Sequence, residues 1–198
     1  MVGNALTNFL KYIFGLYEPF TQTTEKEREA VAKYASGKRS AIEIGVFEGV
    51  NTVIVGQHID PSAKVYGIDP FFKGRLGLCY HEYIARINIR RHKVGNKVIL
   101  IAKLSADAVR DTPAEADFIF IDGDHSYNGI KNDWELYSKK IVPGGIIALH
   151  DTSVPDFDPG RRSLESIRFF EEVIKYDNDF ERLETVDSLN VLRKKSTC

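Results

Sequence analysis

Short apolar runs alternate with stretches of helical spacing from residue 41 to residue 176, and this alternation restricts the fold more than any other feature. Each run has the length of a strand buried on both faces, and each stretch between them can form a crossover helix. The pattern predicts an α/β fold whose mostly parallel sheet carries helices on both faces. The expected strands span residues 41–46, 64–68, 98–102, 118–121 and 146–149, and the expected helices 51–58, 78–93, 105–111, 129–140 and 163–176.

The two ends of the chain complete this architecture. Residues 180–185 and 188–193 are β-like and flank a short turn, which predicts an antiparallel hairpin at the edge of a doubly wound, Rossmann-like sheet of seven strands. Thr24 stands three residues before Glu27, the spacing of a capping box at the start of a helix. We expect a single domain over residues 1–198, with N-terminal helices in 1–36 and the Rossmann-like core in 40–194.

Composition excludes several classes of protein. Lys and Arg number 27 against 28 Asp and Glu, so nothing in the charge balance favours nucleic acid as a partner. No apolar run approaches the roughly 20 residues of a membrane span, and no signal-peptide pattern is present. Cys79 and Cys198 lie far apart, so we expect neither a disulfide nor a cysteine metal site, and a cytoplasmic location fits best. The apolar helical face from Leu6 to Leu16 makes a homodimer a reasonable prediction.

The first expected strand runs into a helix through a glycine-containing turn. Gly45 and Gly49 allow close approach of backbone and ligand, and helix N–H groups open onto the same crevice. The spacing is Gly-x-x-x-Gly and not the Gly-x-Gly-x-x-Gly of a dinucleotide site, so a purely structural turn is an equal alternative. The second strand ends in Asp69, which is placed to accept hydrogen bonds from both hydroxyls of a ribose. A turn-capping role before Pro70 is the alternative for this carboxylate.

Ionisable side chains follow two further strands. Asp122, Asp124 and His125 come after the fourth strand, and His150-Asp151-Thr152 follows the fifth, so both groups reach the carboxyl edge of the sheet, where ligands of open α/β sheets bind. Such clustering is costly unless the groups are solvated, paired or used. Asp122 and Asp151 suit a hard cation such as Mg²⁺, with Asp124, His150 or Thr152 as additional ligands, and a nearby histidine suits a general base.

These motifs together resemble the class I S-adenosylmethionine-dependent methyltransferases, over about residues 21–193. The resemblance implies that the first turn contacts the amino acid part of the cofactor, that the acid of the second strand holds the ribose, and that residues after the third strand border the adenine. The cofactor-binding residues inferred on this basis are Glu43, Gly45, Gly49, Asp69, Ser105, Ala106 and Asp122.

The segment 122–127 with the later 150–152 looks like the metal-dependent small-molecule O-methyltransferases, which include the catechol and macrolide-sugar enzymes and a cephalosporin-biosynthesis relative. In catechol-type enzymes, aspartates after the fourth and fifth strands bind the metal together with an Asn that follows the second of them. Asp122 and Asp151 match here, whereas Thr152 replaces the Asn, and His125 takes the position of the catalytic Lys. The resemblance implies methyl transfer from S-adenosylmethionine to a hydroxyl of a small-molecule acceptor, with His125 as base and Mg²⁺ on Asp122 and Asp151.

Other interpretations stay open at this point. The chain could be a cofactor-binding protein of methyltransferase fold without transfer activity, or a nicotinamide-dependent oxidoreductase, which the missing glycine fingerprint disfavours. His125 has a structural alternative as a bridge between carboxylates, His150 as a hydrogen-bonded core residue and Asp124 as a helix cap. Two further pairs, Gln22 and Thr23 over the cofactor and Arg161 and Arg162 in the loop 153–162 facing an anionic acceptor, have equally plain structural alternatives.

Overall fold

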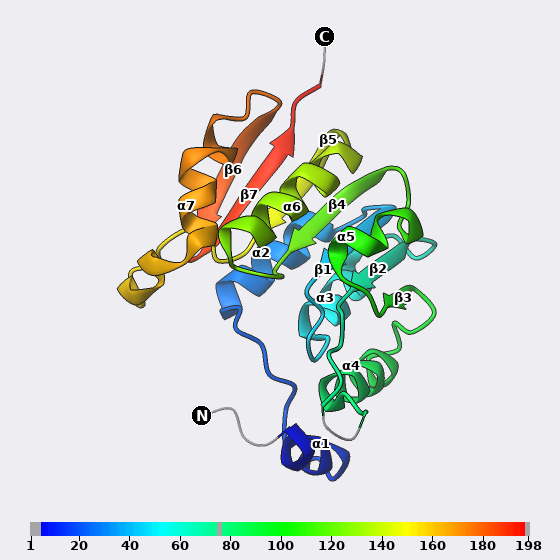
Figure 1. Ribbon diagram of the computed structural model, residues 1–198. Helices are drawn as coiled ribbons and strands as arrows, with labels where there is room; N and C mark the ends of the chain where they lie inside the picture. The colour runs from blue at the N-terminus through cyan, green and yellow to red at the C-terminus, as the bar shows by residue number, and fades with distance from the viewer. Residues whose placement is uncertain (1–4, 75–76, 197–198) are drawn as a thin grey trace.

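A computed structural model describes residues 5–74 and 77–196, in which one twisted sheet runs through the middle of the molecule (Figure 1). Its seven strands are ordered β3-β2-β1-β4-β5-β7-β6. The first five pair in parallel, and β7 then runs antiparallel to both β5 and β6. The predicted Rossmann-like sheet with its C-terminal hairpin is therefore confirmed. Cys198 and the outermost limits of the expected domain lie outside the described residues.

The strands are β1 (Ser40–Ile44), β2 (Lys64–Ile68), β3 (Val98–Ile101), β4 (Ala116–Ile121), β5 (Ile141–Leu149), β6 (Phe180–Val186) and β7 (Leu189–Lys194). The helices are α1 (Ala5–Ile13), α2 (Glu25–Ala35), α3 (Val50–His58), α4 (Tyr80–Arg91), α5 (Ser105–Ala108), α6 (Tyr127–Tyr137) and α7 (Glu165–Glu172). Short 3-10 turns η1 (Val109–Asp111), η2 (Ser138–Lys140), η3 (Pro159–Ser163) and η4 (Ile174–Tyr176) lie between them. None of the helices within the described ranges is long and apolar enough to cross a membrane.

Two apolar cores hold the helices to the sheet. Ile42, Ile119 and Ile147 face the core that α6 and α7 cover, whereas Phe118 and Phe120 face the core that α2 and α3 cover. Alternate residues of β4 thus supply opposite cores, as the two-residue period of a strand requires. This burial on both faces explains why the strands read as continuous apolar runs.

Several element boundaries differ from those that the apolar runs predict. The first strand ends at Ile44 and not at residue 46, because Gly45 turns to a φ of 92°. The fifth strand begins at Ile141, since its first residues pair with β4 although Pro143, Gly144 and Gly145 interrupt the apolar pattern. The helix expected over 163–176 is broken into η3, α7 and η4.

The N-terminal helices have different roles. Helix α1 packs on α4, where Phe9 contacts the rings of Tyr80 and Tyr83. Helix α2 begins with the predicted capping box: Thr24 accepts a hydrogen bond from the Glu27 N–H, and the Glu27 carboxylate accepts one from the Thr24 N–H. Because Glu27 is also buried against the end of β5, α2 is built into the edge of the sheet where the site lies.

Candidate active site

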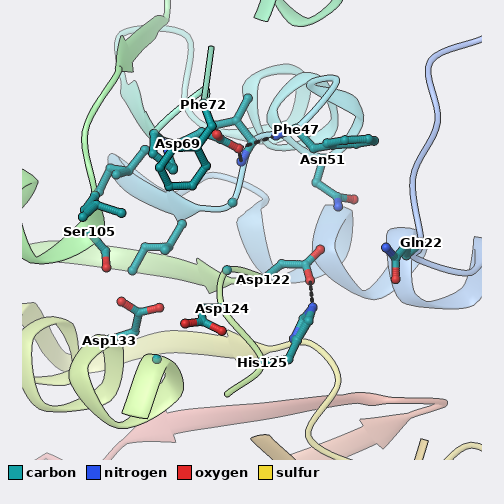
Figure 2. Close-up of a pocket in the computed structure, with 18 of the residues that line it drawn as sticks. Gln22, Phe47, Asn51, Asp69, Phe72, Ser105, Asp122, Asp124, His125 and Asp133 are labelled. Atoms are coloured by element: carbon teal, nitrogen blue, oxygen red, sulfur yellow. Dashed lines mark hydrogen bonds and ion pairs between the residues drawn. The ribbon is translucent and has the colours of Figure 1, made fainter. Parts of the chain in front are cut away.

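A cavity of about 570 Å³ opens at the carboxyl ends of the parallel strands, within the size range of small-molecule sites. Of the residues that the sequence analysis considered for the site, those that line the cavity are Gln22, Gly45, Asp69, Ser105, Ala106, Asp122, Asp124 and His125. Glu43, Gly49 and Asp151 are not among the residues that line it. In Figure 2, Asp69, Phe47 and Asn51 lie on one side of the cavity, and Asp122, Asp124, Asp133 and His125 lie on the other.

The turn after β1 depends on glycine at two positions. A Cβ on Gly45 would stand 1.9 Å from the backbone oxygen of Asp122, so no other residue fits without moving β4. Gly49 caps the N-terminus of α3 with a φ of 77°, and a Cβ there would press against Ala85 of α4 at 3.2 Å. Gly45 therefore keeps two strand ends close beside the cavity, whereas Gly49 serves the packing of α3 on α4.

Asp69 fixes the turn after β1, the structural role that the sequence analysis gave as its alternative. Its Oδ2 accepts hydrogen bonds from the N–H groups of Val46 and Phe47 at 3.1 and 2.8 Å, and its Oδ1 accepts one from the Phe71 N–H at 2.8 Å. A carboxylate offers about four acceptor positions, so the group that fixes this turn can still accept a further donor from the cavity.

Glu43 is an ionisable group buried beneath the turn. Its side chain is 1% exposed, and neither carboxylate oxygen has a hydrogen-bond partner among the described residues. Burial raises the pKa of this carboxyl to about 8, helped by the negative charges of Asp122 and Asp69. The Thr52 hydroxyl, which is close but lacks hydrogen-bond geometry, offsets only part of that rise. Glu43 is thus mainly a neutral acid at pH 7 in the absence of a ligand.

The opposite wall contains an acid that the sequence analysis missed. Asp133 of α6 is buried, lines the cavity beside Ser105, and has its pKa raised to about 6 by burial, with Ser105 opposing that rise. A signal for it exists in the sequence. Ile130, Asp133, Trp134 and Tyr137 share one helix face, and a carboxylate on an otherwise apolar face calls for a specific explanation.

His125 stands where β4 leads into α6, with its ring near two carboxylates. Its Nε2 lies 3.9 Å from Asp122 Oδ1 and 3.7 Å from Asp151 Oδ2, and its side chain is 32% exposed. These separations are too long for hydrogen bonds, so the ring faces the cavity without being fixed to either acid. The Asp124 carboxylate accepts hydrogen bonds from the Ser126 N–H and hydroxyl, and Ser126 in turn caps α6. Asp124 thus supports the helix start indirectly.

His150 is buried, and each of its two ring nitrogens contacts a carboxylate. Its Nδ1 lies 2.9 Å from Asp122 Oδ1 and its Nε2 lies 3.3 Å from Glu27 Oε2. Burial alone would lower the pKa of this imidazole, but the carboxylates of Asp122, Glu27 and Asp151 raise it to about 10. Burial alone would raise the pKa of Glu27, but its hydrogen bonds with His150, Ser188 and Thr24 lower it to about 2. A cation between two anions is therefore built into this edge of the sheet.

The expected metal site does not fit the side chains as they lie. The Asp151 carboxylate is in close contact with the Arg161 guanidinium, and Asp122 is bonded to His150. The Thr152 hydroxyl donates to Leu149 O at 2.8 Å and accepts from the side-chain amide of a neighbouring asparagine in β7. Within residues 5–74 and 77–196, no group of three or more His, Cys, Asp or Glu side chains is arranged to hold a metal ion.

The segment before α2 closes one end of the cavity through contacts that sequence reasoning did not foresee. Glu48 is fully buried and accepts hydrogen bonds from the Tyr17 hydroxyl at 3.0 Å and the Phe20 N–H at 2.6 Å. Phe20, Thr21 and Gln22 line the cavity, and Gln22 is one of the two residues that the sequence analysis considered as a cover for the cofactor. Thr23, which was paired with Gln22 in that expectation, points instead to Asn51, its Oγ1 being 3.3 Å from the amide oxygen.

Comparison with known proteins decides the family. A sequence profile described as a methyltransferase domain matches residues 42–152, more than half of the chain. The chain belongs to this methyltransferase family. It is also 33% identical, over 118 residues, to an uncharacterized protein of Acanthamoeba polyphaga mimivirus, an alignment that takes in 56% of this chain. That alignment covers 50% of the viral protein, so this methyltransferase matches only about half the length of that curated relative.

Solved structures share the fold of this methyltransferase over nearly its whole length. Cofactor-bound Rv0187 from MTB has a TM-score of 0.71 at 17% identity, covering 100% of this chain and 93% of that one. An O-methyltransferase from Bacillus cereus in complex with SAH has a TM-score of 0.69 at 20% identity (98% and 93% covered). The O-methyltransferase TomG from Streptomyces achromogenes, involved in tomaymycin synthesis and in complex with SAM, has a TM-score of 0.66 at 17% identity (99% and 92%). At these identities the similarity establishes the fold.

Proposed function

We propose that this methyltransferase binds S-adenosylmethionine in the 570 Å³ cavity and methylates a hydroxyl group of a small-molecule acceptor. The observation that carries the proposal is the continuity of that cavity, which joins Asp69 at the end of β2 to His125 after β4. It thereby joins an acceptor for ribose hydroxyls to a general base in one space. Bound SAM and SAH in TomG and the Bacillus cereus enzyme support the same choice of cofactor.

The residues around the cavity fit this cofactor. Gly45 leaves room for a ligand to approach the backbone, Asp69 retains acceptor capacity for the ribose, and Ser105 with Ala106 borders the space for a purine. Glu43 lies too deep for direct contact, so we assign it an indirect electrostatic role beneath the cofactor's amino acid part. Gly49 is reassigned to helix packing, and its contribution to binding is through the position of α3.

When bound, S-adenosylmethionine supplies a methyl carbon whose bond to the positively charged sulfur breaks with both electrons remaining on sulfur. The part of this chain is to orient the acceptor and accept its proton. His125 takes the proton of the acceptor hydroxyl on Nε2 while the oxygen forms its bond to the methyl carbon, and Asp122 and Asp151, 3.9 and 3.7 Å away, stabilise the resulting imidazolium. The Asp151 carboxylate is paired with Arg161 and so is not free to bind a metal.

Calorimetric titration with S-adenosylhomocysteine tests the cofactor assignment. We expect saturable binding to the wild type, binding weaker by about tenfold or more in Asp69→Ala, and unchanged binding in Asp179→Ala, a change at an exposed aspartate before β6. Thermal unfolding of each variant separates lost binding from lost folding. Absence of binding to the wild type would refute the proposal and leave nicotinamide nucleotides to be titrated next.

The catalytic assignment needs a separate test. His125→Ala is expected to keep S-adenosylhomocysteine affinity and to lower kcat by roughly 10² to 10⁴ with any acceptor found by screening, because only proton removal is lost. Full turnover by His125→Ala would show that another group removes the proton. Binding of the cofactor with no turnover on any acceptor would favour the alternative, a binding protein of methyltransferase fold.

We further propose that the chain acts as a single domain in the cytoplasm, without nucleic-acid or membrane partners. The exposed side chains of Leu10, Ile13, Phe14 and Leu16 on and after α1 support a homodimer, which light scattering would test.

A further inference from the structure

The Asp151 carboxylate is buried and is paired with a cationic side chain of the protein. Its side chain is 4% exposed, and the Arg161 guanidinium from η3 is in close contact with its Oδ1. Arg161 is itself held in place, since its Nε lies 3.2 Å from Asp158 Oδ2 and its Nη1 lies 3.4 Å from Ser188 Oγ. Guanidinium stays charged at every working pH, so Arg161 presents a cation to Asp151 throughout that range.

Asp122, the second carboxylate of the expected metal site, is in contact with His150. Asp122 Oδ1 lies 2.9 Å from His150 Nδ1, and that ring nitrogen lies 3.6 Å from Asp151 Oδ2. His150 cannot turn away, because its Nε2 contacts Glu27 at 3.3 Å. Arg161 and His150 therefore contact carboxylate oxygens that a divalent ion would need as ligands.

Thr152, the neighbouring oxygen ligand of the expected metal site, is not free to bind an ion either. Thr152 Oγ1 donates to Leu149 O and accepts from Asn190 Nδ2, at 2.8 and 3.0 Å, so its hydroxyl is occupied within the fold. A divalent ion needs several oxygen ligands with free lone pairs directed at one point. At this edge of the sheet Asp122 Oδ1, Asp151 Oδ1 and the Thr152 hydroxyl instead face groups of the protein, so too few free oxygens are directed at one point.

We infer that Arg161 occupies the place of a divalent cation beside Asp122 and Asp151, so that the methyl transfer proposed above proceeds without a metal. The inference rests on that proposed function for its chemistry but not for its geometry. Arg161 does not line the cavity, and it acts as a positioning residue. By holding Asp151 through Oδ1 it leaves Oδ2 of that carboxylate facing the His125 ring, 3.7 Å away, with no ion between them.

Binding of Mn²⁺, followed by electron paramagnetic resonance of the free ion, tests the inference without any turnover. We expect no stoichiometric binding by the wild type up to about 1 mM ion, the weak end of protein cation sites. Arg161→Met, which removes the charge and keeps much of the chain length, is expected to bind one Mn²⁺ with at least about tenfold higher affinity. Arg162→Met changes the exposed neighbouring arginine and is expected to behave as the wild type.

Each outcome decides the matter. One Mn²⁺ bound tightly by the wild type and lost in Asp151→Asn would overturn the inference, and so would an Arg161→Met protein that folds yet gains no site. Circular dichroism checks folding, and Arg161→Gln serves as a second variant. The wild-type titration tests the inference even when neither variant folds. Failure of S-adenosylhomocysteine binding would refute the proposed function, whereas these Mn²⁺ titrations test the cation alone.

Discussion

Replacing Glu43 with a residue that does not titrate should change the pH dependence of the unfolding free energy by an amount that can be calculated. Burial raises the pKa of this carboxyl from 4.5 to about 8, so the folded protein binds a proton there that the unfolded chain has released. For a group whose folded pKa is raised, the associated stability is present below pH 4.5 and is lost as the pH rises through 8. The difference of about 3.5 pH units corresponds to roughly 5 kcal/mol in total, or about 1.4 kcal/mol per pH unit.

Glu43→Gln keeps the shape of the side chain and removes its titration. Between pH 5 and pH 7 we therefore expect the unfolding free energy of the wild type to fall about 1.4 kcal/mol per pH unit more steeply than that of the variant. The comparison of slopes cancels the remaining titratable groups, which both proteins share. The cost of burying an amide changes the level of the variant's curve but not its slope.

Urea unfolding at several pH values gives these slopes. The single tryptophan, Trp134, is 5% exposed in the core beside Phe180 and so reports unfolding by fluorescence. Glu115→Gln, a change at an exposed glutamate, is the matched control and should leave the wild-type slope unchanged. Parallel curves for the wild type and Glu43→Gln would show that Glu43 is not protonated in the folded protein, and would refute the reasoning.

Three further changes probe the rest of the site. Gly45→Ala should abolish S-adenosylhomocysteine binding and lower the melting temperature, because its Cβ would stand 1.9 Å from the backbone oxygen of Asp122; calorimetry and thermal unfolding measure the two effects. The pKa of His150 is raised to about 10, so the stability that its protonation contributes is complete below pH 6.5 and is lost as the pH rises to 10. The unfolding free energy of His150→Gln should therefore decline less between pH 8 and pH 10 than that of the wild type. An equal decline in both proteins would count against a charged His150. Glu48→Gln disrupts the acceptor for the segment before α2, and stopped-flow measurements should show faster release of S-adenosylhomocysteine, with unchanged release arguing that the segment does not close the cavity.

The sheet could be predicted from the sequence because strands buried on both faces consist of apolar residues. Each parallel strand reads as an apolar run, and the acids that follow β2, β4 and β5 lie at one edge because parallel strands end together. Boundaries were less predictable. The end of β1 depends on the φ of Gly45, and the start of β5 depends on pairing with β4, neither of which hydrophobicity encodes.

The partners of the ionisable groups were not readable from local patterns. Glu27 and His150 are 123 positions apart, and their contact follows from how α2 packs on the sheet. Arg161 comes ten residues after Asp151, but an arginine behind a Pro-Gly turn usually lies in solvent. The sequence could therefore supply the acids of a metal site, while Arg161, which we infer to take the place of the metal, became evident only in three dimensions.

Glu27 makes helix α2 part of the folded core, although α2 lies near the N-terminus. One carboxylate ends the first turn of α2, accepts two hydrogen bonds from Ser188 before β7, and contacts the buried ring of His150. A shortened protein that begins at β1 would leave that imidazole in the interior with a partner missing, a defect of about 3 to 5 kcal/mol. This is a large part of the stability of an ordinary domain, so engineered fusions and truncations should spare everything from Thr24 onward.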